Sequence, residues 1–237
     1  MNLAQILENP PAPHRDELGQ PVLWGLTNEV LHFIEERVGP GSRTLETGCG
    51  VSTVLFALTG AQHICIAPGR EEIERLQAYC LQNEICTSDI TFHVEVSENA
   101  LPALKCEPLD LVLIDGRHGF PAPFIDFYYT AGKLKVGGLL VVDDTWLWTG
   151  EILKQYLLSE PEWKHEAEFS QRTSVFRKLG EGSESKEWCH QSFVVDHSRF
   201  KLEAKPVPYL VTALRYARKG QYSLLGKKIA GKFMPRK

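Results

Sequence analysis

Short apolar runs and amphipathic segments alternate along most of this chain. Two of the runs, 109–114 and 138–142, are apolar at almost every position and end in aspartates. Runs that are apolar on both sides are typical of strands in a parallel sheet that is covered by helices on both faces. The pattern predicts seven strands, at residues 43–47, 63–67, 90–96, 109–114, 138–142, 163–169 and 173–179.

Apolar residues at helical spacing separate these strands. They predict helices at residues 26–38, 52–58, 71–82 and 149–158, the first of which ends at the breaker Gly39-Pro40-Gly41. Thr149 is of a residue type that caps helices. Because strand and helix alternate, we expect an α/β, doubly wound, Rossmann-like fold: a mostly parallel seven-stranded sheet with helices on both faces, plus a small C-terminal extension.

Composition divides the chain into an N-terminal arm (1–25), a main domain (26–180) and a C-terminal extension (181–237). Residues 180–186 have the composition of a linker. In the extension we expect a short strand at 193–195, a short helix at 208–218 and a basic tail. Residues 201–237 hold ten basic residues and one acid, whereas the first 200 hold 16 basic and 29 acidic residues. Such a tail suits an acidic partner, a membrane surface or a homodimer contact, or it is a solvated helix face.

The composition also limits the class of protein. With 43% hydrophobic and 24% charged residues, the 237-residue chain has an ordinary globular balance, which excludes wholesale disorder. No apolar run approaches the roughly 18 residues that cross a bilayer, and the first residues lack a signal-peptide pattern. Six scattered cysteines, most of them in apolar segments, favour buried free thiols. We therefore expect a cytoplasmic protein.

A glycine-rich turn follows the first predicted strand. It places Glu46 two residues before Gly48, and Gly50 two residues after it. Glycines let the backbone approach a ligand closely, and the next helix offers free N–H groups at its start. A dinucleotide site would need a third glycine where Thr53 stands. A carboxylate beside such a turn suits a ligand with a positive charge and a hydroxylated sugar.

This turn resembles the Glu/Asp-x-Gly-x-Gly motif of class I S-adenosylmethionine-dependent methyltransferases, and the resemblance extends over about residues 26–179. It implies that the methionine and ribose parts of S-adenosylmethionine contact four residues of the turn: Glu46, Gly48, Gly50 and Ser52.

The sequence departs from this family after the second strand, where Pro68 replaces the usual ribose-binding acid. Glu71 is a candidate substitute. Alternatively, Glu46 and backbone groups hold the ribose, and Glu71 and Glu72 only complement a helix dipole. The family pattern also places Ser97 near the adenine.

Acidic residues follow the two apolar runs, with Asp115 and His118 after one and Asp143 and Asp144 after the other. The carboxyl ends of parallel strands meet at one edge of the sheet, so these side chains should converge. Carboxylates that converge repel one another unless a cation or hydrogen bonds compensate, and oxygen ligands suit Mg²⁺. His118 has a natural pKa near neutrality, which suits a general base.

This group of residues resembles metal-dependent O-methyltransferases that act on sugars. The resemblance implies a Mg²⁺ ion held by Asp115, Asp143 and Asp144, with His118 and Asp115 as catalytic residues. In a second interpretation, Asp115 only binds the cofactor or caps a turn, the two later aspartates cap the segment that follows, and His118 is a packed side chain. Aromatic residues are frequent at 120–129 and recur at Trp146 and Trp148. In one interpretation they wall a substrate pocket. In the other, Phe124, Phe127 and Tyr128 belong to a helix that packs on the sheet.

We therefore expect an enzyme, a methyltransferase that uses S-adenosylmethionine and, with Mg²⁺ as an aid, methylates an oxygen of a small sugar-like acceptor. Asp115-Gly116-Arg117-His118 argues against methylation of nucleic-acid bases, so no nucleic-acid partner is expected. Two alternatives stay open. In the first, the chain is a tailoring hydroxylase on a related scaffold. In the second, it is a binding module that has lost catalysis.

Overall fold

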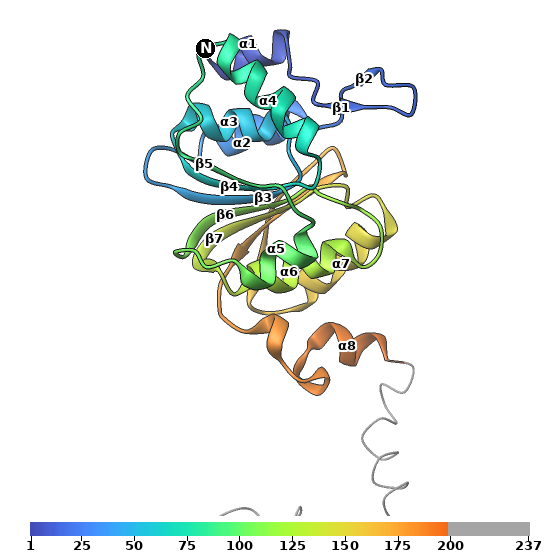
Figure 1. Cartoon of the computed structure of the whole chain (residues 1–237). Coiled ribbons are helices and arrows are strands. Elements are labelled where there is room, and N and C mark those ends of the chain that lie inside the picture. Colours follow the sequence, from blue (N-terminus) through green and yellow to red (C-terminus); the bar gives the residue numbers. More distant parts are fainter. Residues whose placement is uncertain (199–237) are drawn as a thin grey trace, which may run out of the picture. The chain divides into compact units, whose positions relative to one another are not determined.

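The computed structural model describes residues 1–198 of the chain (Figure 1). The chain divides into two compact units, Met1–Glu187 and Trp188–Lys237. A seven-stranded sheet runs through the first unit. Its strands are β3 (Arg43–Thr47), β4 (Gln62–Ile66), β5 (Ile90–His93), β6 (Leu109–Ile114), β7 (Leu134–Val142), β8 (Trp163–Phe169) and β9 (Thr173–Lys178).

The strands lie in the order β5-β4-β3-β6-β7-β9-β8. Strands β3 to β7 are parallel, whereas β9 pairs with β7 and β8 in antiparallel fashion. The mostly parallel seven-stranded sheet is thus confirmed. The chain reverses its direction of progress across the sheet between β3 and β6. In doubly wound sheets, a ligand crevice lies outside the carboxyl ends of the strands at such a point.

Helices cover both faces of the sheet (Figure 1). One face carries α1 (Leu3–Glu8), α2 (Asn28–Glu35), α3 (Val51–Thr59) and α4 (Arg70–Gln82), and the other carries α5 (Ser97–Ala103), α6 (Ala122–Ala131) and α7 (Trp148–Ser159). Alternation along β6 divides the core between the faces: Leu111 and Leu113 pack with the first group, and Val112 and Ile114 with the second. Strand β6 is therefore apolar on both sides, as its sequence indicates.

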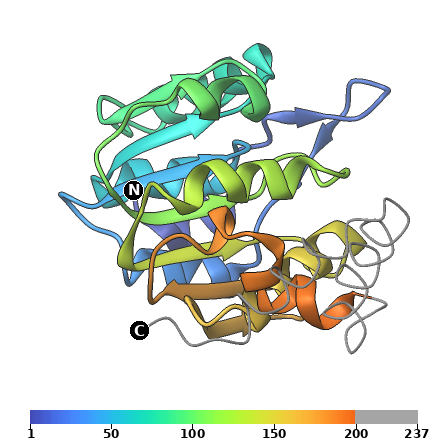
Figure 2. The same ribbon diagram turned by 90° about the horizontal axis from the view of Figure 1, so that it is seen from below.

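The N-terminal residues belong to the same compact unit. Leu3 and Ile6 of α1 are buried against α2, α3 and α4. A short hairpin of β1 (His14–Arg15) and β2 (Pro21–Val22) follows and projects from the sheet and its helices (Figure 2). The structure thus places the predicted arm against the main domain, where its later residues can reach the ligand crevice.

Three expectations about local structure differ from what is observed. The strand expected at 90–96 ends at His93. Strand β7 begins at Leu134, because Lys135, Gly137 and Gly138 interrupt the apolar pattern and hide the first part of the strand. Residues 193–195 are not a strand: they lie in α8 (Ser192–His197), in which the rings of Phe193 and His197, one turn apart, are tilted toward each other with centroids 4.2 Å apart. No neighbouring strand pairs with them among the described residues.

The segment with linker composition, 180–186, is anchored to the first unit. It contains the short 3-10 helix η1 (Ser183–Ser185). The indole Nε1 of Trp163 donates to Ser183 Oγ at 2.8 Å, and the Tyr156 hydroxyl donates to the Ser183 carbonyl at 2.8 Å. Polar composition alone does not show that a small hydroxyl residue is a buried bonding partner.

The second unit begins with the 3-10 helix η2 (Trp188–His190) and α8. The basic tail and the helix expected at 208–218 lie outside the described residues. Among the helices of residues 1–198, none has both the length and the apolar character to cross a membrane. All six cysteines are free, although only Cys49, Cys65 and Cys80 are buried. The cytoplasmic location and the homodimer contact stay predictions.

Candidate active site

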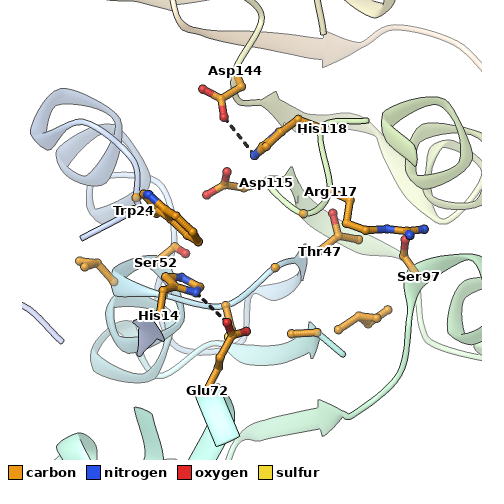
Figure 3. Close-up of a pocket in the computed structure, with 18 of the residues that line it drawn as sticks. His14, Trp24, Thr47, Ser52, Glu72, Ser97, Asp115, Arg117, His118 and Asp144 are labelled. Carbon is orange, nitrogen blue, oxygen red and sulfur yellow. Dashed lines mark hydrogen bonds and ion pairs between the residues drawn. The ribbon is translucent and has the colours of Figure 1, made fainter. Parts of the chain in front are cut away.

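A pocket of about 630 Å³ lies at the carboxyl ends of the parallel strands (Figure 3). Its walls come from the turn after β3, the end of β4, the start of α5, the loops after β6 and β7, and residues 14–25 of the N-terminal segment. The crevice expected from the fold is therefore formed, and segments distant in sequence meet around it.

The glycine-rich turn forms one wall of the pocket. Gly48, Gly50 and Ser52 line it, as the sequence predicts. Gly48 has a φ of 96°, in the region that favours glycine, and a Cβ at this position would overlap the carbonyl oxygen of Asp115. Glycine at position 48 is thus needed both for the turn and for the close approach of β3 to β6.

Glu46 lies beneath the turn and is not among the residues that line the pocket. Its buried carboxylate accepts hydrogen bonds from the hydroxyl groups of Ser52, at 2.7 Å, and Thr53, and lies 3.1 Å from His63 Nε2. These contacts hold the turn from inside. Direct contact between Glu46 and a ligand stays a prediction, and the structure gives this carboxylate a bracing position.

The two acids at the start of α4 have different surroundings. Glu71, the predicted ribose contact, is exposed, pairs with Arg75 at 3.2 Å and does not line the pocket. Glu72 lines the pocket, and its Oε1 lies 3.1 Å from Nδ1 of His14 (Figure 3). Helical spacing gives a signal for this difference, because Glu72 lies one turn before the buried Leu76 and so shares its face.

Ser97 lines the pocket at the N-terminus of α5, where the sequence analysis expects it. Behind this wall lies Asp126 of α6, which the sequence analysis did not single out. Its side chain is fully buried, and burial raises the pKa of its carboxyl group. Asp126 has no sequence motif, and only its place on the sheet-facing side of α6 brings it here.

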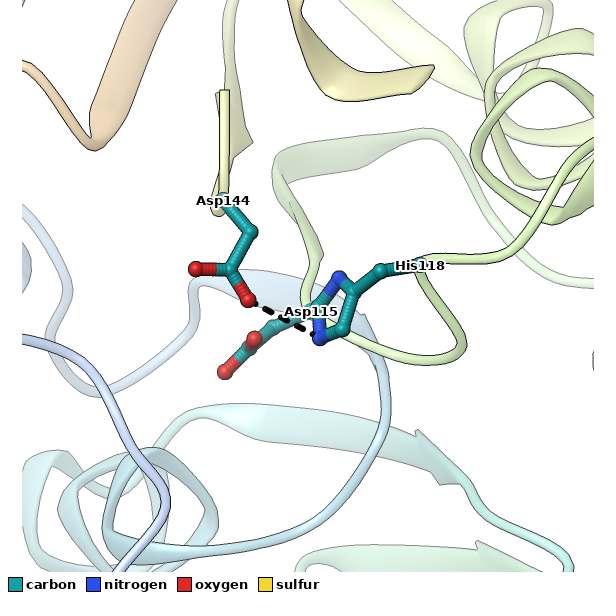
Figure 4. Close-up of side chains that lie close together, drawn as sticks. All are labelled: Asp115, His118 and Asp144. Carbon is teal, nitrogen blue, oxygen red and sulfur yellow. Dashed lines mark ion pairs between the residues drawn. The ribbon is translucent and has the colours of Figure 1, made fainter. Parts of the chain in front are cut away.

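Three of the four predicted acid-base residues converge at the other end of the pocket (Figure 4). Asp115, His118 and Asp144 each offer a ligand atom within 4.8 Å of the other two. The Nε2 atom of His118 lies 3.0 Å from Oδ2 of Asp144. Burial, followed by the charges of Asp143 and Asp144, raises the pKa of Asp115 well above its usual range. The arrangement combines an imidazole with a carboxyl group that resists ionisation.

Asp143 does not join this group. Its side chain is fully buried and turns toward β9, where Oδ2 lies 2.9 Å from Nη2 of Arg172 and Oδ1 accepts a hydrogen bond from the Thr173 hydroxyl. The structure thus brings two of the three predicted carboxylates together, because successive residues at a strand end point to opposite sides. A role of Asp143 in holding a metal ion stays a prediction.

Arg172 is a site residue that the sequence analysis did not identify. It lies between β8 and β9 and lines the pocket, and its Nε is 3.0 Å from Oδ1 of Asp144. Burial alone would lower the pKa of Arg172, but the charges of Asp143 and Asp144 outweigh this effect and raise it. Its position depends on the antiparallel pairing of β7 with β9, so no local motif announces it.

A family model described as a methyltransferase domain matches residues 45–145, which include the glycine turn and the two strand ends. Residues 45–145 are thus part of a methyltransferase domain, and the chain has the fold of class I methyltransferases. No protein with a curated description matches the sequence.

Solved structures share the fold of this methyltransferase domain. TomG, an O-methyltransferase from Streptomyces achromogenes involved in tomaymycin synthesis and solved with SAM, has a TM-score of 0.59 and 18% identity, over 75% of this chain and 89% of that chain. A Corynebacterium glutamicum protein has a TM-score of 0.59 and 16% identity, over 76% and 90%. An rRNA methylase from Streptococcus thermophilus has a TM-score of 0.50 and 13% identity, over 67% and 99%. These names differ in acceptor, so the fold does not choose among acceptors.

Two tryptophans flank the mouth of the methyltransferase pocket. Trp24 and Trp146 line it with 61% and 67% of their surface exposed. Trp148 and Phe120 are exposed nearby in sequence but do not line it, whereas Phe127 of α6 is buried on the sheet. The helix interpretation of residues 120–129 is therefore confirmed for α6. Thr149 is not a helix cap: Leu147 has that position, and the Thr149 hydroxyl donates to the carbonyl of His118.

Proposed function

We propose that this methyltransferase domain transfers the methyl group of S-adenosylmethionine to a hydroxyl oxygen of a small, sugar-like acceptor, with His118 as the general base. The observation that carries the proposal is the meeting of His118 and Asp115 in the same pocket as the glycine turn. An imidazole that faces a shared pocket suits the removal of a proton from a hydroxyl group.

We assign S-adenosylmethionine to one end of the pocket from the residues that line that end. Gly48, Gly50 and Ser52 line the end at which the turn gives access to backbone N–H groups. Of the two acids on α4, Glu72 has access to the pocket, so we assign to it the sugar contact that the sequence analysis expected from Glu71. A carboxylate is a suitable acceptor for two adjacent hydroxyl groups.

We assign the acceptor to the end of the pocket opposite the glycine turn. Trp24 and Trp146 offer flat apolar surfaces at the pocket mouth, on which a sugar face or another ring can stack. The acid-base groups lie deeper, so a bound ring would present a hydroxyl group to them. Such an acceptor is small, because it enters a pocket of about 630 Å³ together with the cofactor.

The reaction needs little chemistry from the protein beyond orientation. The acceptor oxygen attacks the methyl carbon, the carbon–sulfur bond breaks with its electron pair on sulfur, and S-adenosylhomocysteine is formed. The hydroxyl proton passes to the imidazole of His118. Holding two substrates in line accounts for the larger share of the rate enhancement, and the base contributes the rest.

The three carboxylates predicted to hold Mg²⁺ do not meet as one set of ligands. Asp143 faces away, and Oδ1 of Asp144 already accepts a hydrogen bond from Trp146 Nε1 at 2.7 Å and lies 3.0 Å from Arg172 Nε. A hard cation needs oxygen atoms with free lone pairs and no adjacent positive charge. We therefore derive no step through a metal ion.

The test is transfer of labelled methyl from S-adenosylmethionine to a panel of polyhydroxylated small molecules, with an rRNA fragment as a competing class. For the acceptor found, His118→Gln should lower kcat by about 10²–10⁴-fold, the usual contribution of a general base, and leave S-adenosylhomocysteine affinity unchanged. His32→Gln, an exposed histidine on α2, is the matched control. Near-normal turnover of His118→Gln, or label on the RNA alone, would contradict the proposal.

A further inference from the structure

Two buried or nearly buried carboxylates at the end of β7 need a compensating charge. The Asp143 side chain is fully buried and that of Asp144 is 12% exposed, and they are neighbours in sequence. Carboxylates so close together cannot both ionise cheaply without a cation. The resemblance to metal-dependent O-methyltransferases implies that this cation is a metal ion.

The structure assigns this charge to the guanidinium group of Arg172, and we propose that methyl transfer in this domain is independent of a divalent cation. This inference rests on the proposed function and concerns the same site. In this inference, Arg172 supplies a fixed positive charge. It is also a positioning residue, because it holds Asp144 beside His118.

The geometry of Arg172 matches this role. One edge of its guanidinium spans both acids, with Nη2 at 2.9 Å from Oδ2 of Asp143 and Nε at 3.0 Å from Oδ1 of Asp144. The planar guanidinium is suited to such double contacts, whereas a lysine ammonium is a single point charge. Arg172 therefore fixes the direction of both carboxylates as well as their charge.

The backbone of Arg172 is also held in place. Its carbonyl accepts hydrogen bonds from the backbone N–H of Thr145, at 2.7 Å, and from the Thr145 hydroxyl, at 2.8 Å. Thr145 directly follows Asp144, and Ser174 pairs with Val142 at the end of β7. The pairing of β7 with β9 thus fixes the position of Arg172 relative to Asp143 and Asp144. A mobile surface arginine would not be held in this way.

Most carboxylate oxygens of the pair are occupied as a result. Both oxygens of Asp143 contact Arg172 or Thr173, and Oδ1 of Asp144 contacts Arg172 and Trp146. The remaining Oδ2 of Asp144 faces His118. At the Asp143–Asp144 pair, a divalent cation would meet one oxygen without an Arg172, Thr173 or Trp146 contact, Oδ2 of Asp144, and the positive charge of Arg172 next to it.

Asp115 has no ion-pair partner within residues 1–198. It lies in the pocket beside the glycine turn, where the methyl donor is expected. The sulfonium of S-adenosylmethionine carries a positive charge, so the bound cofactor itself compensates Asp115. Arg172 then faces the Asp143–Asp144 pair, and the bound cofactor faces Asp115.

The experiment measures binding of Mn²⁺ and Mg²⁺ to the metal-stripped full-length protein, by electron paramagnetic resonance and by calorimetry, and binding of S-adenosylhomocysteine in parallel. Wild type should bind neither ion at millimolar concentration. Arg172→Gln, which removes the charge, should acquire Mn²⁺ affinity and lose it again when Asp144→Asn is added. Arg172→Lys keeps the positive charge and should bind no ion. This variant also serves as the test if Arg172→Gln fails to fold. Arg177→Gln, which changes a paired arginine on β9, is the control.

Turnover gives the second readout. With any acceptor found, a chelator should change the wild-type rate less than twofold. Stoichiometric Mn²⁺ binding by wild type, with turnover lost to the chelator, would overturn the inference, as would Arg172→Gln that binds no ion and keeps wild-type kcat and KM. Absence of S-adenosylhomocysteine binding would instead contradict the proposed function, and the ion-binding result would stand apart from it.

Discussion

The two ends of the pocket are built in opposite ways. Under the glycine turn, the carboxylate of Glu46 contacts Ser52, Thr53 and His63. Glu46, Ser52 and Thr53 lie within eight residues of one another. At the acid-base end, Asp115, Asp144 and Arg172 come from three separate parts of the chain, and Asp115 has no ionic partner within the described residues. The first end is a locally satisfied support for a ligand. The second holds unbalanced charge that a substrate can complete.

The largest expected effect comes from breaking the support. Gly48→Ala places a Cβ against the carbonyl of Asp115 and forces a non-glycine residue to a φ of 96°. A strained backbone of this kind costs of order 1–3 kcal/mol before the overlap is counted. We expect at least a hundredfold loss of S-adenosylhomocysteine affinity by calorimetry. Gly39→Ala has open space around its Cβ and should bind as wild type does; equal affinity in both variants would show that the turn is not a ligand wall.

A smaller effect should separate the two acids of α4. Glu72→Gln removes a charge that lines the pocket, and S-adenosylhomocysteine affinity should fall about tenfold, or about 1.4 kcal/mol. Glu71→Gln changes an exposed side chain one position away and should have no effect. If Glu71→Gln is the variant that loses affinity, the assignment of the sugar contact to Glu72 is wrong.

The smallest effect sharpens the contrast in charge. Burial and the neighbouring aspartates raise the folded-state pKa of Asp115 above the unfolded value of about 3.9. Its contribution to stability is therefore present below that pH and is lost as pH rises through the folded-state pKa. Asp115→Asn should match wild type near pH 4 and exceed its free energy of unfolding by about 1 kcal/mol at pH 8.

Urea unfolding at both pH values measures this difference, with Asp110→Asn as a control at the other end of β6, where Lys135 lies 2.8 Å away and lowers the pKa against the opposing effect of burial. Equal stability of Asp115→Asn and wild type at pH 8 would mean that Asp115 carries no penalty for ionisation.

Much of the fold could be predicted because each strand carries its own signal. The run 109–114 matches β6 residue for residue, since a strand buried on both sides is apolar at almost every position. The start of β7 had no such signal, because Lys135, Gly137 and Gly138 interrupt the apolar pattern there. The three residues 193–195 looked like a strand, but a strand needs a partner, and a local pattern does not supply one.

The candidate site was predictable where it is local and only partly so where it depends on direction. The motif singled out Glu46, Gly48 and Gly50, but it did not show that Glu46 points under the turn. Alternation at the end of β7 already implied that Asp143 and Asp144 could not both face one pocket. Arg172 was out of reach, because its role arises from the pairing of β9 with β7.

The most direct test of the account is calorimetric titration of folded wild-type protein with S-adenosylmethionine and S-adenosylhomocysteine, with NAD as the control ligand. The account predicts micromolar binding of both sulfur nucleotides and none of NAD, without added metal. A folded protein that binds neither sulfur nucleotide would contradict it, because the turn at Gly48 would then be a turn without a ligand.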